Sequence, residues 1–225
     1  MKKKGIFLCA LFYMVYVLLI AGYAGSEETV GKTEISETRV TEAPRIALTF
    51  DDGPSCYTEE LLDGLKARGV TATFFIIGQS AEEFPEVVKR EAKEGHLIGN
   101  HTYSHVEITK LSNDKAREEI EKTNTILTEL TGKPVEYIRP PFGLWQKKLE
   151  QEMDVMPVMW SVDPLDWTTK NVDEIVNKVV TEAEEDDIIL LHDCYKSSVE
   201  AAFRIIDLLK AEGYEFVTAD KLLLN

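Results

Sequence analysis

The chain has 225 residues, of which 44% are hydrophobic and 29% charged, and its formal net charge is −15 at pH 7. This length allows one sizeable core and is too short for two ordinary domains plus a tail. The acidic balance makes nucleic acid and anionic membrane surfaces poor partners. A neutral polymer or a small molecule fits such a surface better.

The first 25 residues differ in kind from the rest. Three lysines at positions 2–4 precede an apolar run from Ile6 to Ala21, and small residues follow. This is the layout of a secretory signal peptide. The run is also nearly long enough to span a bilayer, so an uncleaved membrane anchor is the alternative. In either case the remainder is expected outside the cytoplasm, with membrane attachment only through this segment.

Residues 26–44 are rich in Glu, Thr and Ser and show no apolar period, which predicts a flexible acidic linker before a single domain at 45–225. In that domain short apolar runs alternate with helical periods. The expected strands are 45–50, 71–77, 97–100, 135–138, 155–162, 188–191 and 215–218. The expected helices are 59–68 with Thr58 as N-cap, 85–94, 112–131, 145–152, 171–183, 198–212 and a short terminal one.

Seven β-then-α units in strict alternation predict a parallel sheet, either doubly wound or closed as a barrel. Polar residues capable of chemistry lie just past the first, third, fourth, fifth and sixth strands, and none lie at the opposite ends. An active site built from many C-terminal loops is typical of a barrel, whereas an open sheet concentrates its site at one switch point. We therefore expect a barrel.

Two adjacent carboxylates, Asp51 and Asp52, end the first strand, and Gly53-Pro54 forces a turn after them. Like charges this close raise one another's pKa unless a metal or a basic residue lies nearby, so a cation is expected opposite them. The alternative is a turn and helix-capping role, which Asp commonly has.

His101 and His105 stand four residues apart, a spacing that puts two imidazoles on one side of a helical turn. With one Asp from the first loop they form a set of two histidines and a carboxylate that leaves coordination positions open, as in a catalytic metal site. Two solvated or hydrogen-bonded loop histidines are the alternative.

The second Asp is then free to act as a base. Arg139, in a Pro-rich turn, could pair with it, although an ordinary surface ion pair is the alternative. His192 follows an apolar strand and is suited to be a general acid, or is simply a buried histidine. Asp166 could raise the pKa of His192 and set its tautomer.

Aromatic residues and the remaining histidine carry weaker signals. Trp167 is either a sugar-stacking wall or part of the core. His96 precedes a strand, at the opposite end from the other histidines, and is interpreted as structural. Trp145 and Trp160 are assigned to packing.

Five stretches resemble, in order, the five motifs of the polysaccharide deacetylase family, also called carbohydrate esterase family 4, which shares the NodB homology domain. They are TFDDGP at 49–54, HTYSH at 101–105, RPPFG at 139–143, DPLDW at 163–167 and LLH at 190–192. The resemblance runs from about Arg45 to the C-terminus, and no motif departs at a chemically essential position. It implies a distorted (β/α)7 barrel with parallel strands.

The resemblance also implies roles for individual residues. Asp52, His101 and His105 would bind a divalent metal, usually zinc, with cobalt, nickel or manganese as alternatives. Asp51 would be the general base, held by Arg139.

On the other side of the substrate, His192, tuned by Asp166, would protonate the leaving amine. Trp167 and Leu190 would line the pocket for the acetyl group and sugar, and the backbone N–H of Phe142 would help to stabilise the oxyanion.

These roles imply a metal-dependent hydrolase that removes N-acetyl groups from an N-acetylglucosamine-containing polysaccharide, of the peptidoglycan or chitin type, and releases acetate. We expect an exported monomer, secreted or anchored at the outer face of the bacterial cytoplasmic membrane. The alternatives are an O-acetyl xylan esterase with the same residues and a glycan-binding module without catalysis, which intact Asp51 and His192 argue against. A phosphoesterase would need a basic phosphate clamp that is missing.

The two cysteines outside the leader, Cys56 and Cys194, follow the first and last of these motifs. In an oxidising compartment an even pair predicts a disulfide, here one that staples two loops beside the groove. Two unpaired thiols in loops are the alternative.

Overall fold

The computed structural model describes residues 43–149 and 152–223. The predicted leader and residues 26–42 of the predicted linker lie outside the described residues. Within the described part of the chain, no helix is both long enough and apolar enough to cross a membrane.

The described residues contain a seven-stranded sheet in which every pairing is parallel. Its strands are β1 (Arg45–Asp51), β2 (Thr73–Ile76), β3 (Leu97–Asn100), β4 (Tyr137–Ile138), β5 (Met156–Pro157), β6 (Ile188–His192) and β7 (Glu215–Val217). Neighbouring strands follow the order β5-β4-β3-β2-β1-β6. β7 pairs with the first half of β1, whose second half pairs with β2. The predicted class, a distorted (β/α)7 barrel with parallel strands, is confirmed.

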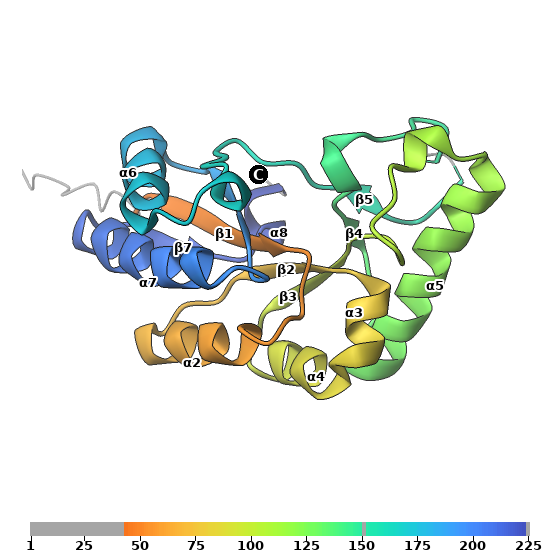
Figure 1. Ribbon diagram of the computed structural model, residues 1–225, viewed down its shortest axis with the longest axis horizontal. Coiled ribbons are helices and arrows are strands. Elements are labelled where there is room, and N and C mark those ends of the chain that lie inside the picture. Colours follow the sequence, from red (N-terminus) through yellow and green to blue (C-terminus); the bar gives the residue numbers. More distant parts are fainter. Residues whose placement is uncertain (1–42, 150–151, 224–225) are drawn as a thin grey trace, which may run out of the picture. The chain divides into compact units, whose positions relative to one another are not determined.

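Helices connect the strands and cover their outer side. They are α2 (Thr58–Arg68), α3 (Gly78–Glu83), α4 (Pro85–Lys93), α5 (Asn113–Thr131), α6 (Val172–Glu182), α7 (Lys196–Ala211) and α8 (Asp220–Leu223). Figure 1 shows them ranged along the strands, from α6 and α7 through α2 and α4 to α5, and successive helices in this series contact one another. Short 3-10 turns lie at Ile108–Lys110, Pro141–Gly143 and Asp166–Thr168.

The central strand β1 is buried along almost its whole length, from Ile46 to Asp51. Strands covered on both faces read as continuous apolar runs, which explains the sequence of this segment. Leu48 and Phe50 join Phe74 of β2 and the inner faces of α2 and α7 in the main core. The core therefore fixes β1 rigidly, and with it the acidic pair at its end.

Several helix boundaries follow the sequence signals, but α3 was not predicted and α7 begins at Lys196, two residues earlier than expected. Ser112 caps α5 by accepting a hydrogen bond from the backbone N–H of Lys115, and Asn171 caps α6 in the same way. Thr58, the predicted cap of α2, is instead its first helical residue. The predicted helix at 145–152 is wrong, since residues 145–149 form no α-helix.

Four predicted strands are shorter than expected, among them the fourth, which is only Tyr137–Ile138, and the seventh, which ends at Val217. The second begins at Thr73 instead of residue 71. The fifth, predicted at 155–162, pairs with β4 only at Met156–Pro157, and its far end bridges from Val162 to Ile189 of β6. A segment with one end on β4 and the other on β6 has to cross between them, so it cannot run as one straight strand. This crossing is the distortion of the barrel.

Candidate active site

The predicted site residues meet at the carboxyl ends of the strands. Asp51, the last residue of β1, pairs in register with His192, the last residue of β6. His101 directly follows β3, and Arg139 directly follows β4. Because parallel strands end at the same edge, four separated stretches of sequence are brought together here.

Three of these side chains form a candidate metal centre. The Oδ1 atom of Asp52 lies 3.3 Å from Nε2 of His101 and 3.2 Å from Nε2 of His105. All three ligand atoms lie within 4.8 Å of one another. The structure therefore brings the predicted Asp-His-His set together.

The donor set fits a cation. Nδ1 of His101 lies 2.6 Å from the carbonyl oxygen of Arg139, which can only accept, so this nitrogen carries the proton and Nε2 turns its lone pair toward Asp52. Burial lowers the pKa of His105, which favours its neutral form. Oδ1 of Asp52 is buried and has no hydrogen-bond partner among the described residues. A buried acceptor facing two imidazole nitrogens needs a positive charge between them.

The two histidines do not share a helical turn as their spacing predicts. Residues 101–105 form a loop in which Thr102 (φ 63°) and His105 (φ 53°) adopt left-handed backbone conformations. Glu119 of α5 accepts hydrogen bonds from the backbone N–H groups of Tyr103 and Ser104 and holds this loop in place. Non-glycine residues persist in this region only when their surroundings impose it, and they gather at functional sites.

Asp51 and Arg139 form a buried ion pair. Nη1 of Arg139 lies 2.8 Å from Oδ1 of Asp51, and neither side chain has appreciable exposure. The other guanidinium donors reach Thr49 and the carbonyl oxygens of Val158 and Met159. The alternative of a surface ion pair is therefore wrong, and Asp51 is held in a single orientation.

His192 is paired with Asp166. Its Nδ1 lies 2.7 Å from Oδ1 of Asp166, and its backbone N–H donates to Oδ2 at 2.9 Å. Burial alone would lower the pKa of His192, but the hydrogen bond and charge of Asp166, with smaller contributions from Asp51 and Asp52, raise it to about 9. At neutral pH the imidazole therefore carries a proton that Nε2 can donate.

These groups face a pocket of about 390 Å³. Phe142 and Trp167 stand at its rim with 62% and 57% of their surfaces exposed, so Trp167 is no part of the core. Leu190 lines the pocket as a buried residue. The Phe142 ring lies 5.1 Å from that of His105, and its backbone is left-handed (φ 62°) within the Pro-rich turn.

Sequence reasoning gave no site role to four residues of this pocket: Pro140, Trp160, Asp163 and Tyr195. Trp160, which was assigned to packing, lines the pocket instead. Tyr195 gave one usable signal, its position three residues after His192 in the same loop. Trp145 does pack, against the smaller core around Ile108.

The predicted disulfide is wrong, because Cys56 and Cys194 are both free thiols. The two loops that it was to join are linked by hydrogen bonds instead. The Thr58 hydroxyl donates to the Asp193 carboxylate, and the Ser55 hydroxyl donates to the Asp193 carbonyl oxygen. Asp193 is fully buried against Gly53, where an added Cβ would collide with both carboxylate oxygens.

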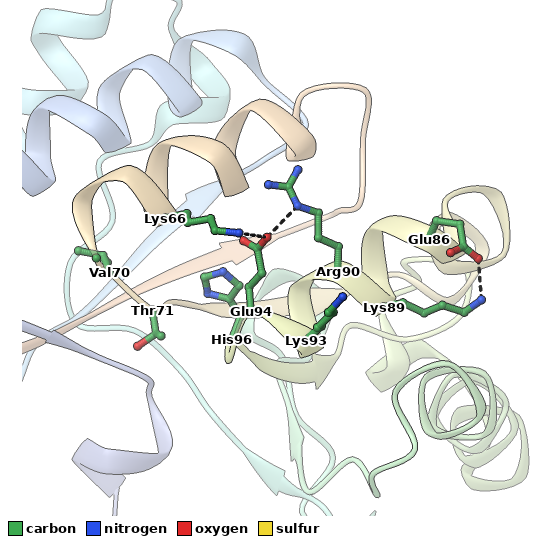
Figure 2. A pocket seen from close by; sticks show the side chains of 10 residues that line it. Lys66, Val70, Thr71, Glu86, Lys89, Arg90, Lys93, Glu94 and His96 are labelled. Carbon is green, nitrogen blue, oxygen red and sulfur yellow. Dashed lines mark hydrogen bonds and ion pairs between the residues drawn. The ribbon is translucent and has the colours of Figure 1, made fainter.

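His96 lies apart from this site, at the amino-terminal ends of the strands, as predicted. Figure 2 shows it at the hollow between α2 and α4. Its Nδ1 accepts a hydrogen bond from the backbone N–H of Ala72, and burial lowers its pKa to about 4. It is therefore a neutral structural histidine.

Comparison with known proteins agrees with this geometry. The family model for polysaccharide deacetylase matches residues 38–159, more than half of the chain. The chain belongs to the polysaccharide deacetylase family. The matched range includes the first three of the five stretches, at 49–54, 101–105 and 139–143.

Three similar polysaccharide deacetylases illustrate the match. The chain is 45% identical to a peptidoglycan-N-acetylglucosamine deacetylase of Bacillus cereus, over 77% of this chain and 66% of that protein. It is 36% identical to a bifunctional xylanase/deacetylase of Pseudobutyrivibrio xylanivorans, over 95% of this chain and 35% of that protein. The solved structure of peptidoglycan deacetylase PdaC from Bacillus subtilis is 39% identical with a TM-score of 0.79, over 81% of this chain and 91% of that one. The chain spans less than two thirds of the length of both curated relatives.

Proposed function

We propose that this protein hydrolyses N-acetyl groups on a polysaccharide that contains N-acetylglucosamine, of the peptidoglycan or chitin type, and releases acetate. The observation that carries the proposal is one pocket that combines a buried Asp-Arg pair, a His-Asp pair and a candidate metal centre. The similarity to relatives named as peptidoglycan deacetylases supports peptidoglycan as the substrate.

In this proposal Asp52, His101 and His105 hold a divalent cation. The set of two imidazoles and one carboxylate suits zinc and leaves positions open. When bound, the cation supplies Lewis-acid chemistry: it polarises the acetyl carbonyl and lowers the pKa of a water molecule.

The protein's own residues perform the proton transfers. Asp51, oriented by Arg139, takes the proton of the attacking water as general base. The backbone N–H of Phe142 donates to the developing oxyanion. His192, positioned by Asp166, gives its proton to the leaving nitrogen.

An O-acetyl esterase is the second candidate, favoured by the similarity to a xylanase/deacetylase. The pKa of His192, about 9, supports the amide over the ester. An amine leaves poorly unless it is protonated, so a histidine that keeps its proton at neutral pH serves N-deacetylation in particular.

We further propose that the protein works outside the cytoplasm, on a cell-wall glycan, and is either secreted or anchored at the outer face of the cytoplasmic membrane. Relatives named for peptidoglycan support this location. The apolar run from Ile6 to Ala21 is the feature that would direct export.

The experiment measures acetate release from peptidoglycan, N-acetylglucosamine oligomers and acetylated xylan, with and without chelator. We expect zinc-dependent release from the N-acetylated substrates and a loss of about 10²- to 10⁴-fold in kcat for Asp51→Asn and His192→Ala. Release from xylan alone would establish the esterase instead. A parent protein that releases no acetate with zinc or cobalt would leave only a glycan-binding role.

A further inference from the structure

A second hollow, of about 480 Å³, adjoins the catalytic pocket. The two share Trp167 and Tyr195 as lining residues. The second hollow then continues over the start of α7, to Lys170 and Lys196. None of the predicted roles uses these two lysines.

A polymer with one acetyl group in the catalytic pocket has to extend beyond it. A sugar next to the reacting one would reach this hollow by crossing the shared wall, where Trp167 is 57% and Tyr195 is 39% exposed. Exposed aromatic side chains with a polar end suit the apolar faces of sugars. The neighbouring unit of the polymer is therefore the natural occupant.

The charges of the hollow point to the chemistry of that occupant. Lys170 is exposed and makes no ion pair with any residue in the described ranges. Lys196 contacts Glu200 at 3.6 Å, and both side chains are about half exposed or more, so the contact is weak and exchangeable. Asp166 and Glu200 also line the hollow, but Asp166 is paired with His192 and Glu200 only weakly with Lys196, so two available lysines beside an aromatic wall favour an anionic group.

The hollow between α2 and α4 offers a contrast. It is also rich in basic residues, but Lys66 and Arg90 both reach Glu94, and Lys89 reaches Glu86, as Figure 2 shows. Three of its four cations thus form ion pairs with these two carboxylates, and Lys93 forms none with the described residues. Lys93, an exposed residue of that hollow, supplies a matched control far from the catalytic pocket.

We propose that the hollow beside Trp167 binds a carboxylate carried by a branch on the sugar next to the deacetylated one, with Lys170 and Lys196 as its recognition residues. This inference rests on the proposed function and narrows its substrate class to glycans with acidic branches. In peptidoglycan the carboxylate comes from the attached peptide or, where no peptide is attached, from the free lactyl group of muramic acid. A chitin oligomer has neither.

The test compares three soluble substrates: glycan strands with their peptides, the same strands after an amidase has removed the peptides, and neutral N-acetylglucosamine oligomers. For the Lys170→Ala/Lys196→Ala variant we expect KM on the peptide-bearing strands to rise about three- to tenfold with kcat unchanged. KM on the neutral oligomer should not change, and Lys93→Ala should match the parent on all substrates. High salt should remove the difference between parent and variant.

The amidase-treated strands identify the source of the carboxylate. In the peptide-bearing strands the lactyl carboxyl is bound as an amide, so a rise in KM on them assigns the carboxylate to the peptide. A rise that appears only on the amidase-treated strands, whose lactyl carboxylate is free, assigns it to the lactyl group. An active parent whose KM is unaffected by the double substitution, or is affected equally on the neutral oligomer, would overturn this inference alone. A parent inactive on all three substrates would overturn the proposed function and this inference with it. Equal thermal midpoints for parent and variants exclude a folding defect.

Discussion

Arg139 is a fully buried cation, and each of its three guanidinium nitrogens donates at least one hydrogen bond. It also lies over the ring of Phe75 at 4.2 Å. A buried charge of this kind persists only when it is paired and hydrogen-bonded. Removal of its charge would therefore leave the carboxylate of Asp51 buried without a partner.

Arg139→Met should accordingly lower the free energy of unfolding by about 3–5 kcal/mol and abolish acetate release. The measurement is urea unfolding followed by circular dichroism. Arg204→Met is the matched control, since Arg204 forms an exposed ion pair with Asp173 and should cost no more than about 1 kcal/mol. Equal losses for the two variants would contradict a buried pair.

His192 gives the reaction a predicted alkaline limit. Its pKa is raised to about 9 from an ordinary value of 6.5, so the protonated form persists in the folded protein at neutral pH. Since the proposed acid must be protonated, kcat should fall as pH rises through its pKa. A bound cation repels the imidazolium and lowers the pKa of His192, so we expect the fall in kcat at or below pH 9.

Asp166→Asn removes the main contribution that raises this pKa, and it should move the alkaline limb toward pH 6.5. The His192–Asp166 pair also stabilises the folded state, because the pKa of His192 is higher there than in the unfolded chain. This stabilisation is fully present below pH 6.5 and is lost as pH rises through the folded pKa. A pH profile of kcat for parent and variant tests the first statement. An unshifted limb would show that His192 is not the titrating acid.

At the scale of elements, two loops frame the site. The loop after β1 carries Asp52, and the loop after β6 begins directly after His192. Asp193 joins them, because its carboxylate accepts from Thr58 of α2 while it lies against Gly53. The Asp193 carboxylate packs so closely against Gly53 that no side chain could be placed there. These two loops are therefore positioned by one buried contact.

Gly53→Ala should push the carboxylate aside and lower kcat by at least tenfold, with a loss of about 1–3 kcal/mol in stability. Asp193→Ala should cost a similar amount, because Thr58 loses its acceptor. In the double variant the collision is gone, so the second substitution should cost less than it does alone. Additive losses in a double-mutant cycle would refute direct contact as the cause.

How far sequence could predict this site depends on the element. Asp51, Arg139 and His192 end or follow apolar strands, so the parallel topology alone predicts that they meet. The loop at 101–105 was not predictable in the same way, since its shape, with left-handed Thr102 and His105, depends on hydrogen bonds from Tyr103 and Ser104 to Glu119, sixteen and fifteen residues away in sequence. The prediction of the fifth strand as one straight element was wrong because its two ends pair with different strands. Such pairing is a tertiary effect, which the local β-propensity of the sequence does not predict.

At the scale of the whole molecule, the candidate metal centre joins loops that follow β1 and β3. A cation that binds the folded state but not the unfolded one stabilises it by mass action, by about 2.7 kcal/mol at a hundred times its Kd. We expect zinc to raise Tm by several degrees and chelator to reverse the shift.

Asp52→Asn should abolish the zinc-dependent shift in calorimetry while leaving the metal-free Tm near that of the parent. Asp207→Asn, on the exposed face of α7, is the control and should keep the full shift. A shift that survives in Asp52→Asn would place the cation elsewhere in the chain.

The two thiols beside the catalytic pocket have very different chemistry. Cys56 is exposed, whereas burial, with the nearby charges of Asp52 and Asp193, raises the pKa of Cys194 to about 12. Only thiolates react with alkylating reagents, so of this pair Cys56 alone is open to modification near neutral pH. The loops around the site owe nothing to a cross-link, so the domain can mature under reducing conditions. A single fluorophore on Cys56, four residues after Asp52 in the same loop, could then be used to report glycan binding.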